Sequence, residues 1–148
     1  MSIDERTDHV LRRVRSDIAR FGQSIMYVAG SSNSFSYTIG RTERGLPELL
    51  MAFPLAAEQA HAILNHLDDQ MPEAREDGSL VDMGGKYPIK LLDVTDPRVF
   101  DEYCTIVWRF YGEKARVQQV LLPGLDGRYP PDCRPPYNRQ PVLGRTTH

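Results

Sequence analysis

The sequence predicts an α+β domain built on a mostly antiparallel, partly closed sheet of five or six strands, with three flanking helices and an extended proline-rich C-terminal tail. Two observations carry this prediction. Apolar residues recur at helical spacing in three separate stretches, and several short stretches rich in β-formers follow one another without an intervening helix. Strands that are adjacent in this way favour antiparallel pairing, whereas a doubly wound parallel sheet would need regular alternation of strands and helices.

The first expected element is a helix that ends near Gly22, because apolar residues recur at helical spacing before it and glycine commonly caps a helix C-terminus. Two short strands are expected next, over 24–29 and 35–39, with turn residues between them at 30–33. They read as a hairpin or as two neighbouring antiparallel strands, and Tyr37 lies on the same face as the other large side chains of the second strand.

A polar loop separates these strands from a third strand over 48–53, whose run of apolar residues predicts burial on both faces. A helix over 55–71 follows, and Pro72 ends it because proline cannot continue a helix. Two further strands are expected over 80–83 and 86–94. The second contains a proline, which indicates a sheet edge or a bulge.

The clearest helical stripe of the chain begins at Asp96, an N-cap residue followed by a proline at the first helical position, and ends near Gly112. The last strand is expected over 115–122. More than half of the 11 prolines lie after it, so residues 124–148 are expected to form an extended tail. We expect this tail to wrap against the α+β domain formed by residues 1–123.

Length, composition and charge are those of one ordinary globular domain. The chain has 148 residues, of which 41% are hydrophobic and 26% are charged, and its net charge is −2. This balance gives no overall attraction to nucleic acid or to an anionic membrane. The charged N-terminus lacks the apolar core of a signal peptide, and no stretch approaches the ~20 apolar residues of a membrane span. We therefore expect a cytoplasmic protein that does not bind membranes.

Charged side chains gather in the loop after the strand over 35–39, which makes this loop the main candidate for a binding site. Arginines in a glycine-bounded loop suit a phosphate or carboxylate, because a guanidinium offers paired donors. The alternative is a solvated loop with internal Arg–Glu pairs. A second candidate is the turn around Asp126, although Asp-Gly is also ordinary turn chemistry. The residues expected to bind a ligand or partner are Tyr37, Arg41, Glu43, Arg44, Glu48, Asp126, Arg128, Arg139 and Gln140.

The sequence contains no recognisable catalytic or metal-binding constellation. His61 and His66 are five residues apart on an expected helix, whereas a helical metal pair needs a spacing of three or four. Cys104 and Cys133 lie in no nucleophile or metal motif and are expected to be reduced thiols. We therefore expect no metal and no cofactor, and we favour a protein that is not an enzyme.

Three stretches carry a family resemblance, namely 35–49, 118–130 and 139–144. Together they resemble a bacterial and phage family of unknown function, DUF4262, over about residues 15–144. Members of that family usually have Trp-Pro-Asp where this chain has Leu-Pro-Gly-Leu-Asp at 122–126, so the loop is altered here. The resemblance implies a fold class and no settled activity.

Three functions remain open. The first is a non-enzymatic module that binds a protein partner or a small anionic ligand through the charged loop. The second is a flavin- or nucleotide-binding oxidoreductase, because Tyr37 to Gly40 is faintly similar to the strand that leads into a loop in split-barrel flavin proteins. The third is nucleic-acid binding through the arginines of the first helix, which acidic residues dilute. An exposed strand edge near Pro88 also leaves homodimerisation open.

Overall fold

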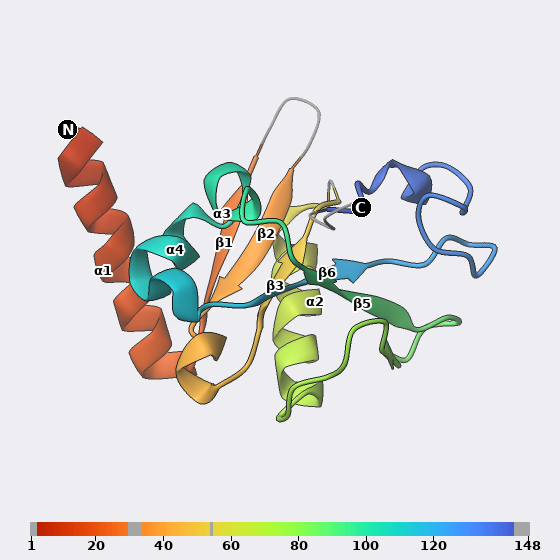
Figure 1. The fold of residues 1–148 in the computed structure, drawn as a ribbon, viewed down its shortest axis with the longest axis horizontal. Helices are drawn as coiled ribbons and strands as arrows, with labels where there is room; N and C mark the ends of the chain where they lie inside the picture. The colour runs from red at the N-terminus through yellow and green to blue at the C-terminus, as the bar shows by residue number, and fades with distance from the viewer. Residues whose placement is uncertain (1–2, 30–33, 54, 144–148) are drawn as a thin grey trace.

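The computed structural model describes residues 3–29, 34–53 and 55–143, and its centre is one six-stranded sheet (Figure 1). The strands lie in the order β1-β2-β3-β6-β5-β4, and every neighbouring pair is antiparallel except β3 and β6. Their bounds are β1 (Ser24–Val28), β2 (Phe35–Ile39), β3 (Glu48–Met51), β4 (Leu80–Val81), β5 (Ile89–Val94) and β6 (Val117–Leu121). The mostly antiparallel α+β prediction is confirmed. The sheet is open, with β1 and β4 as its edges, so the expectation of partial closure is wrong.

Helices cover both faces of the sheet. Their bounds are α1 (Ile3–Phe21), α2 (Ala57–Gln70), α3 (Val99–Glu102) and α4 (Thr105–Tyr111), and short 3-10 turns occur at η1 (Arg41–Arg44), η2 (Gly112–Lys114) and η3 (Tyr137–Arg139). One hydrophobic cluster joins α2 to one face, and a second joins α1, α3 and α4 to the other. None of the described helices combines the length and the apolar character needed to cross a membrane.

Strand β3 is buried on both faces, as its apolar run predicts. Leu49 and Met51 belong to the cluster beside α2, whereas Leu50 belongs to the cluster beside α1 and α4. This division follows from the alternation of side chains along a strand. The expected turn at 30–33 lies outside the described residues.

The third expected helix is divided in two at Tyr103 and Cys104, whose backbone angles are not helical. In an unbroken helix Cys104 would point about 140° away from Val99, five residues before it. With the break, Val99, Cys104 and Val107 are all buried in the same cluster. The break therefore lets one short segment place all three side chains in the core.

The proline-rich tail contacts the domain through side chains of β6 and of the tail itself. Gln140 accepts a hydrogen bond from the Leu122 N–H and donates one to the Leu122 carbonyl, both at 2.9 Å. Gln119 donates to the carbonyl of Pro141, and the Tyr137 ring stacks on Phe53 at 5.2 Å between centroids. Residues 144–148 of the expected tail lie outside the described residues.

Candidate functional site

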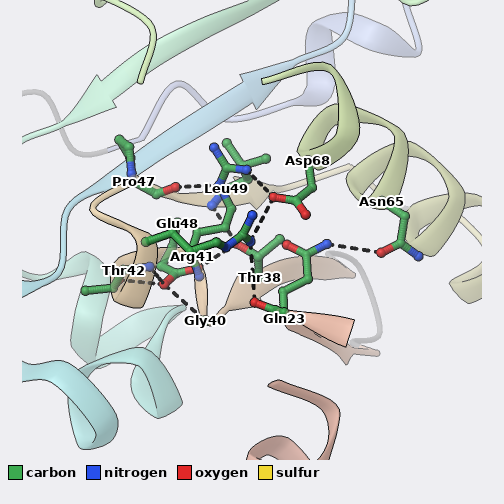
Figure 2. Close-up of polar contacts among 12 residues, drawn as sticks. Gln23, Thr38, Gly40, Arg41, Thr42, Pro47, Glu48, Leu49, Asn65 and Asp68 are labelled. Atoms are coloured by element: carbon green, nitrogen blue, oxygen red, sulfur yellow. Dashed lines mark hydrogen bonds and ion pairs between the residues drawn. The ribbon is translucent and has the colours of Figure 1, made fainter. Parts of the chain in front are cut away.

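The charged loop (residues 40–48) is organised around the carboxylate of Glu48, which is 0% exposed. This carboxylate accepts hydrogen bonds from the backbone N–H groups of Gly40, Arg41 and Thr42 at 2.8–3.2 Å. It also accepts from the hydroxyls of Thr38 and Thr42 at 2.8 and 2.6 Å (Figure 2). Burial raises the pKa of Glu48, and these hydrogen bonds oppose that shift. Because five donors already face the Glu48 carboxylate, its oxygens have little capacity to accept further hydrogen bonds.

The three consecutive N–H groups form a concave nest of the kind that binds anions in many proteins. Here the chain's own Glu48 fills the nest, and the bond between the Thr38 hydroxyl and the Leu49 N–H extends the network into β3. An external phosphate or carboxylate would have to displace Glu48 from its five donors. The nest therefore serves the fold rather than an added anion.

The guanidinium of Arg41 is also used inside the protein, where the side chain is 1% exposed. Its Nε donates to the Pro47 carbonyl at 2.8 Å, and its Nη1 pairs with the Asp68 carboxylate of α2. Arg44 reaches the same carboxylate at 3.0 Å and the Gly22 carbonyl at 3.4 Å. Burial lowers the pKa of Arg41, and Asp68 opposes this shift. These contacts join the charged loop to α2 and to the turn after α1.

The remaining residues expected around this loop also have partners in the protein. Tyr37 is buried, and its hydroxyl accepts a hydrogen bond from the Ile106 N–H at 3.4 Å. Burial raises the pKa of Tyr37 to about 12. The Tyr111 hydroxyl donates to the carboxylate of Glu43. Among the described residues no Arg–Glu ion pair occurs within the loop, and both loop arginines pair with Asp68 of α2 instead.

The second expected cluster lies far from the charged loop. Strands β3 and β6 are parallel, with Glu48 opposite Val117, so the charged loop lies at the start of β6. Asp126 and Arg128 follow the end of β6, which is at the opposite end of the sheet (Figure 1). Five strand residues separate the two ends by roughly 16 Å. The two candidate clusters therefore do not share one cleft.

The turn at 124–128 is closed by its own hydrogen bonds. Gly124 donates to the Arg128 carbonyl at 2.8 Å, and the Arg128 N–H donates to the Asp126 carboxylate at 3.2 Å. Of the two tail residues expected in the site, Gln140 is buried and ties the tail to β6, whereas Arg139 is exposed. These four residues belong to the tail end of the sheet.

A pocket of about 500 Å³, which we call the edge pocket, adjoins the charged loop on the side of α1 and α2. Its lining residues are Asp17, Phe21, Gln23, Ser24, Ile25, His61, Asn65 and Asp69. Gln23 Nε2 donates to Asn65 Oδ1 at 3.0 Å (Figure 2), which holds the entry of β1 against α2. Among the described residues the lining contains two aspartates and no arginine or lysine, so the edge pocket is acidic.

The edge pocket spans the outer edge of the sheet. Strand β1 pairs only with β2, and in the described part of the chain no backbone hydrogen bond joins its other edge to any segment. Ile25 belongs to the cluster beside α2, and its neighbour Met26 to the cluster beside α1. Helices α1 and α2 therefore cover opposite faces of β1, and the pocket includes the strand edge between them.

Two features of the lining set it apart from ordinary surface. Phe21 is 67% exposed at the end of α1. Gln23 is 5% exposed, and its Oε1 has no hydrogen-bond partner among the described residues. A buried acceptor without a partner costs about 1–3 kcal/mol and is uncommon in native proteins.

Sequence reasoning missed the edge pocket. A signal was present, because His61, Asn65 and Asp69 recur every four residues and so share one face of α2. Asp17 and Phe21 share a face of α1 in the same way. That these two faces meet at β1 depends on the topology, which the spacing does not reveal.

A model of the DUF4262 family, a domain of unknown function, matches residues 17–134. The chain belongs to this family. The match confirms the resemblance expected from the sequence, although it ends before the closing motif at 139–144. Comparison with curated proteins and with solved structures found no match.

The other functions considered for the DUF4262 chain have less support from its geometry. The sheet is open, whereas the flavin proteins to which Tyr37 to Gly40 is similar are split barrels. Arg15 and Arg20 of α1 lie over the rings of Phe110 and Phe21, at 5.6 and 5.1 Å from the ring centroids, so α1 does not present its arginines as one free basic face. Burial raises the pKa of the Cys104 thiol, which makes it a poor nucleophile.

Proposed function

We propose that the chain is a non-enzymatic binding module whose protein partner lays an extended segment along β1, with a basic side chain in the edge pocket. The observation that supports this most is an open strand edge inside an acidic pocket. An anionic ligand at the charged loop has less support, because Glu48 fills the nest and Asp68 pairs with both loop arginines.

The strand edge supplies the means of recognition. An unpaired edge presents a row of N–H and C=O groups that an extended segment can pair with. Native proteins usually protect such edges with charge, proline or a covering element. Strand β1 contains no proline or charged residue over Ser24–Val28, and it is longer than the opposite edge strand, β4, which has two residues. Edge β1 is thus the better template.

The charges of the edge pocket favour a basic side chain on that segment. Asp17 already accepts a hydrogen bond from the Ser24 hydroxyl at 2.8 Å, whereas Asp69 is exposed and has no ion pair among the described residues. Exposed pairs of this type contribute about 0.2–1 kcal/mol each. Such ion pairs therefore determine whether a basic or an acidic segment is preferred, and they contribute little to the total affinity.

Binding also benefits from a site that is already formed. The Gln23–Asn65 hydrogen bond and the Arg44 contacts to Gly22 and Asp68 fix the walls of the edge pocket before any partner arrives. A preformed site avoids part of the ordering cost of association. The Gln23 Oε1 atom is buried without a hydrogen-bond partner among the described residues. Such an arrangement does not favour stability, and a bound partner could supply the missing donor.

The test is an NMR titration of the isotope-labelled full chain with two extended pentapeptides, acetyl-Thr-Val-Arg-Val-Thr-amide and the same peptide with Glu in place of Arg. We expect the Arg peptide to shift the amide signals of Ser24–Val28 and to slow hydrogen exchange at the outer edge of β1. The Glu peptide is expected to bind more weakly. Shifts confined to other surfaces would contradict the proposal.

Two variants of α2 provide a matched pair. Asp69→Lys reverses a charge of the edge pocket and is expected to weaken binding of the Arg peptide about fivefold. Glu58→Lys makes the same change on an exposed residue near the start of α2, outside the pocket lining, and is expected to leave binding unchanged. Equal effects of the two variants would show that net charge alone attracts the peptide. If the chain sediments as a dimer and the amides of β1 are protected from hydrogen exchange without any peptide, the strand edge binds a second copy of the chain instead.

A further inference from the structure

The two short helices α3 and α4 bring together Phe100 and Trp108, whose ring centroids lie 5.3 Å apart at an interplanar angle of 43°. In one continuous helix these residues would lie about 12 Å apart along the axis, because they are eight positions apart. The break at Tyr103 and Cys104 turns α4 back towards α3. The ring pair therefore exists only because the helix is divided.

A cavity of about 470 Å³ opens beside these rings, and we call it the aromatic corner. Its lining residues are Pro97, Phe100, Asp101, Trp108, Glu113 and Ala115. Trp108 is 46% exposed, although its neighbour Val107 is fully buried. An indole left in contact with water beside a second ring forms an apolar surface with no role in the core.

The charges at the aromatic corner all have one sign. Asp101 and Glu113 line the cavity, and no basic side chain of the described segments does. Among the residues that the structure describes, neither carboxylate forms an ion pair. The faces of aromatic rings also carry partial negative charge. A positively charged group would thus be attracted both by the rings and by the carboxylates.

We propose that the aromatic corner is a binding site for an alkylammonium group, which packs its methyl or methylene groups on Trp108 and Phe100 while Asp101 and Glu113 balance its charge. Aromatic rings combined with carboxylates suit such cations, because a ring face attracts a large, weakly hydrated cation. A metal ion fits less well, since no group of three potential ligand side chains occurs in the described parts of the chain. The proposal is independent of the edge pocket, which involves other elements.

Trp108 is the only tryptophan of the chain, so its fluorescence reports on the aromatic corner directly. The full chain is titrated at constant ionic strength with tetramethylammonium, with choline, and with the neutral analogue of choline in which carbon replaces nitrogen. We expect a saturable change with both cations in the millimolar range and at least about fivefold weaker binding of the neutral analogue. Equal binding of choline and its neutral analogue would overturn the proposal.

Variants separate the site from a general effect of charge. The double variant Asp101→Asn, Glu113→Gln is expected to weaken tetramethylammonium binding at least about threefold. Glu102→Gln is the matched control, because Glu102 is adjacent to Asp101 but lines a different cavity. This variant is expected to bind tetramethylammonium as tightly as the wild type does. A similar loss of affinity in the double variant and in Glu102→Gln, or no loss in the double variant, would overturn the proposal.

A final pair of ligands distinguishes the source of the alkylammonium group. A short peptide that contains trimethyllysine is compared with free tetramethylammonium, and the change at Trp108 is followed for each. Tighter binding of the peptide would assign the site to a modified side chain of a protein, whereas equal or weaker binding would assign it to a free small molecule. Absence of a saturable change with both ligands would overturn the proposal.

Discussion

The charged loop and the edge pocket are neighbours in space, yet their charged side chains are used in opposite ways. In the charged loop, Glu48 and Arg41 are buried, and their side chains form hydrogen bonds with other groups of the loop and with Asp68 of α2. In the edge pocket, Asp69 is exposed and available to a ligand. Asp68 and Asp69 are consecutive in α2, and one belongs to each region.

This contrast shows that a dense run of charged residues is a weak guide to a binding site. Burying an ion is costly unless partners surround it, so a buried charged cluster has to be satisfied internally and becomes part of the framework. The charged loop connects α2, β3 and the turn after α1 in this manner. The edge pocket contains fewer charges, and one of them, Asp69, is exposed and forms no ion pair among the described residues.

The largest expected effect comes from Asp68→Asn, which removes the charge that balances buried Arg41. Loss of one partner of a buried ion pair typically costs about 3–5 kcal/mol, and the value is expected at the lower end because Asp68 is partly accessible. Urea denaturation measures the change. Asp69→Asn is the matched control and is expected to leave the unfolding midpoint unchanged. Equal midpoints for the two variants would show that the Arg41–Asp68 pair has no structural role.

A somewhat smaller loss is expected for Glu48→Gln. The amide keeps the size of the side chain but places an N–H₂ group where the carboxylate accepts hydrogen bonds, which leaves buried donors such as the Thr42 and Gly40 N–H unsatisfied at a cost of about 2–3 kcal/mol. Urea denaturation again measures the loss, with the exposed Glu43→Gln as control. Wild-type stability of Glu48→Gln would show that the hydrogen bonds to the Glu48 carboxylate do not contribute to the stability of the fold.

Local sequence patterns predicted the elements well but not their assembly. The strand at 35–39 has the bounds expected from its alternation, and the two helices over 3–21 and 57–70 follow their apolar stripes. The division of the third helix was not predictable from periodicity, because the advantage of burying Cys104 exists only in the presence of the sheet. Closure of the sheet was also mispredicted, since strand order is a property of distant pairings.

For the candidate site, the sequence identified charged residues but not their partners. Arg41 and Glu48 stood out as a cluster, whereas Asp68 lies 27 positions from Arg41 and had no distinguishing pattern. The separation of Arg41 from Arg128 depends on β3 and β6 running parallel, and no local signal marks that pairing. Chemistry that depends on two distant segments cannot be read from either segment alone.

A moderate effect is expected for Gln140→Ala in the tail. Gln140 is buried and forms hydrogen bonds with the N–H and the carbonyl of Leu122 at the end of β6, so its loss is expected to cost about 1–2 kcal/mol. The readout is proteolysis, which should release the tail sooner than in the wild type while the rest of the domain persists. Arg139→Ala, on an exposed neighbour, serves as control. Unchanged proteolysis of Gln140→Ala would show that other contacts hold the tail.

The smallest effect is expected for Asp69→Asn, and it should appear in binding rather than in stability. Removing one exposed carboxylate of the edge pocket is expected to weaken the Arg peptide only about two- to threefold, because one exposed pair contributes less than about 1 kcal/mol. The binding of the Glu peptide should rise or stay constant, since a repulsive charge has been removed. NMR titration of both peptides measures this change of preference. An equal loss of affinity for the two peptides would mean that Asp69 shapes the pocket and does not select the charge of the ligand. Asp68 and Asp69 would then both have structural roles that differ only in size.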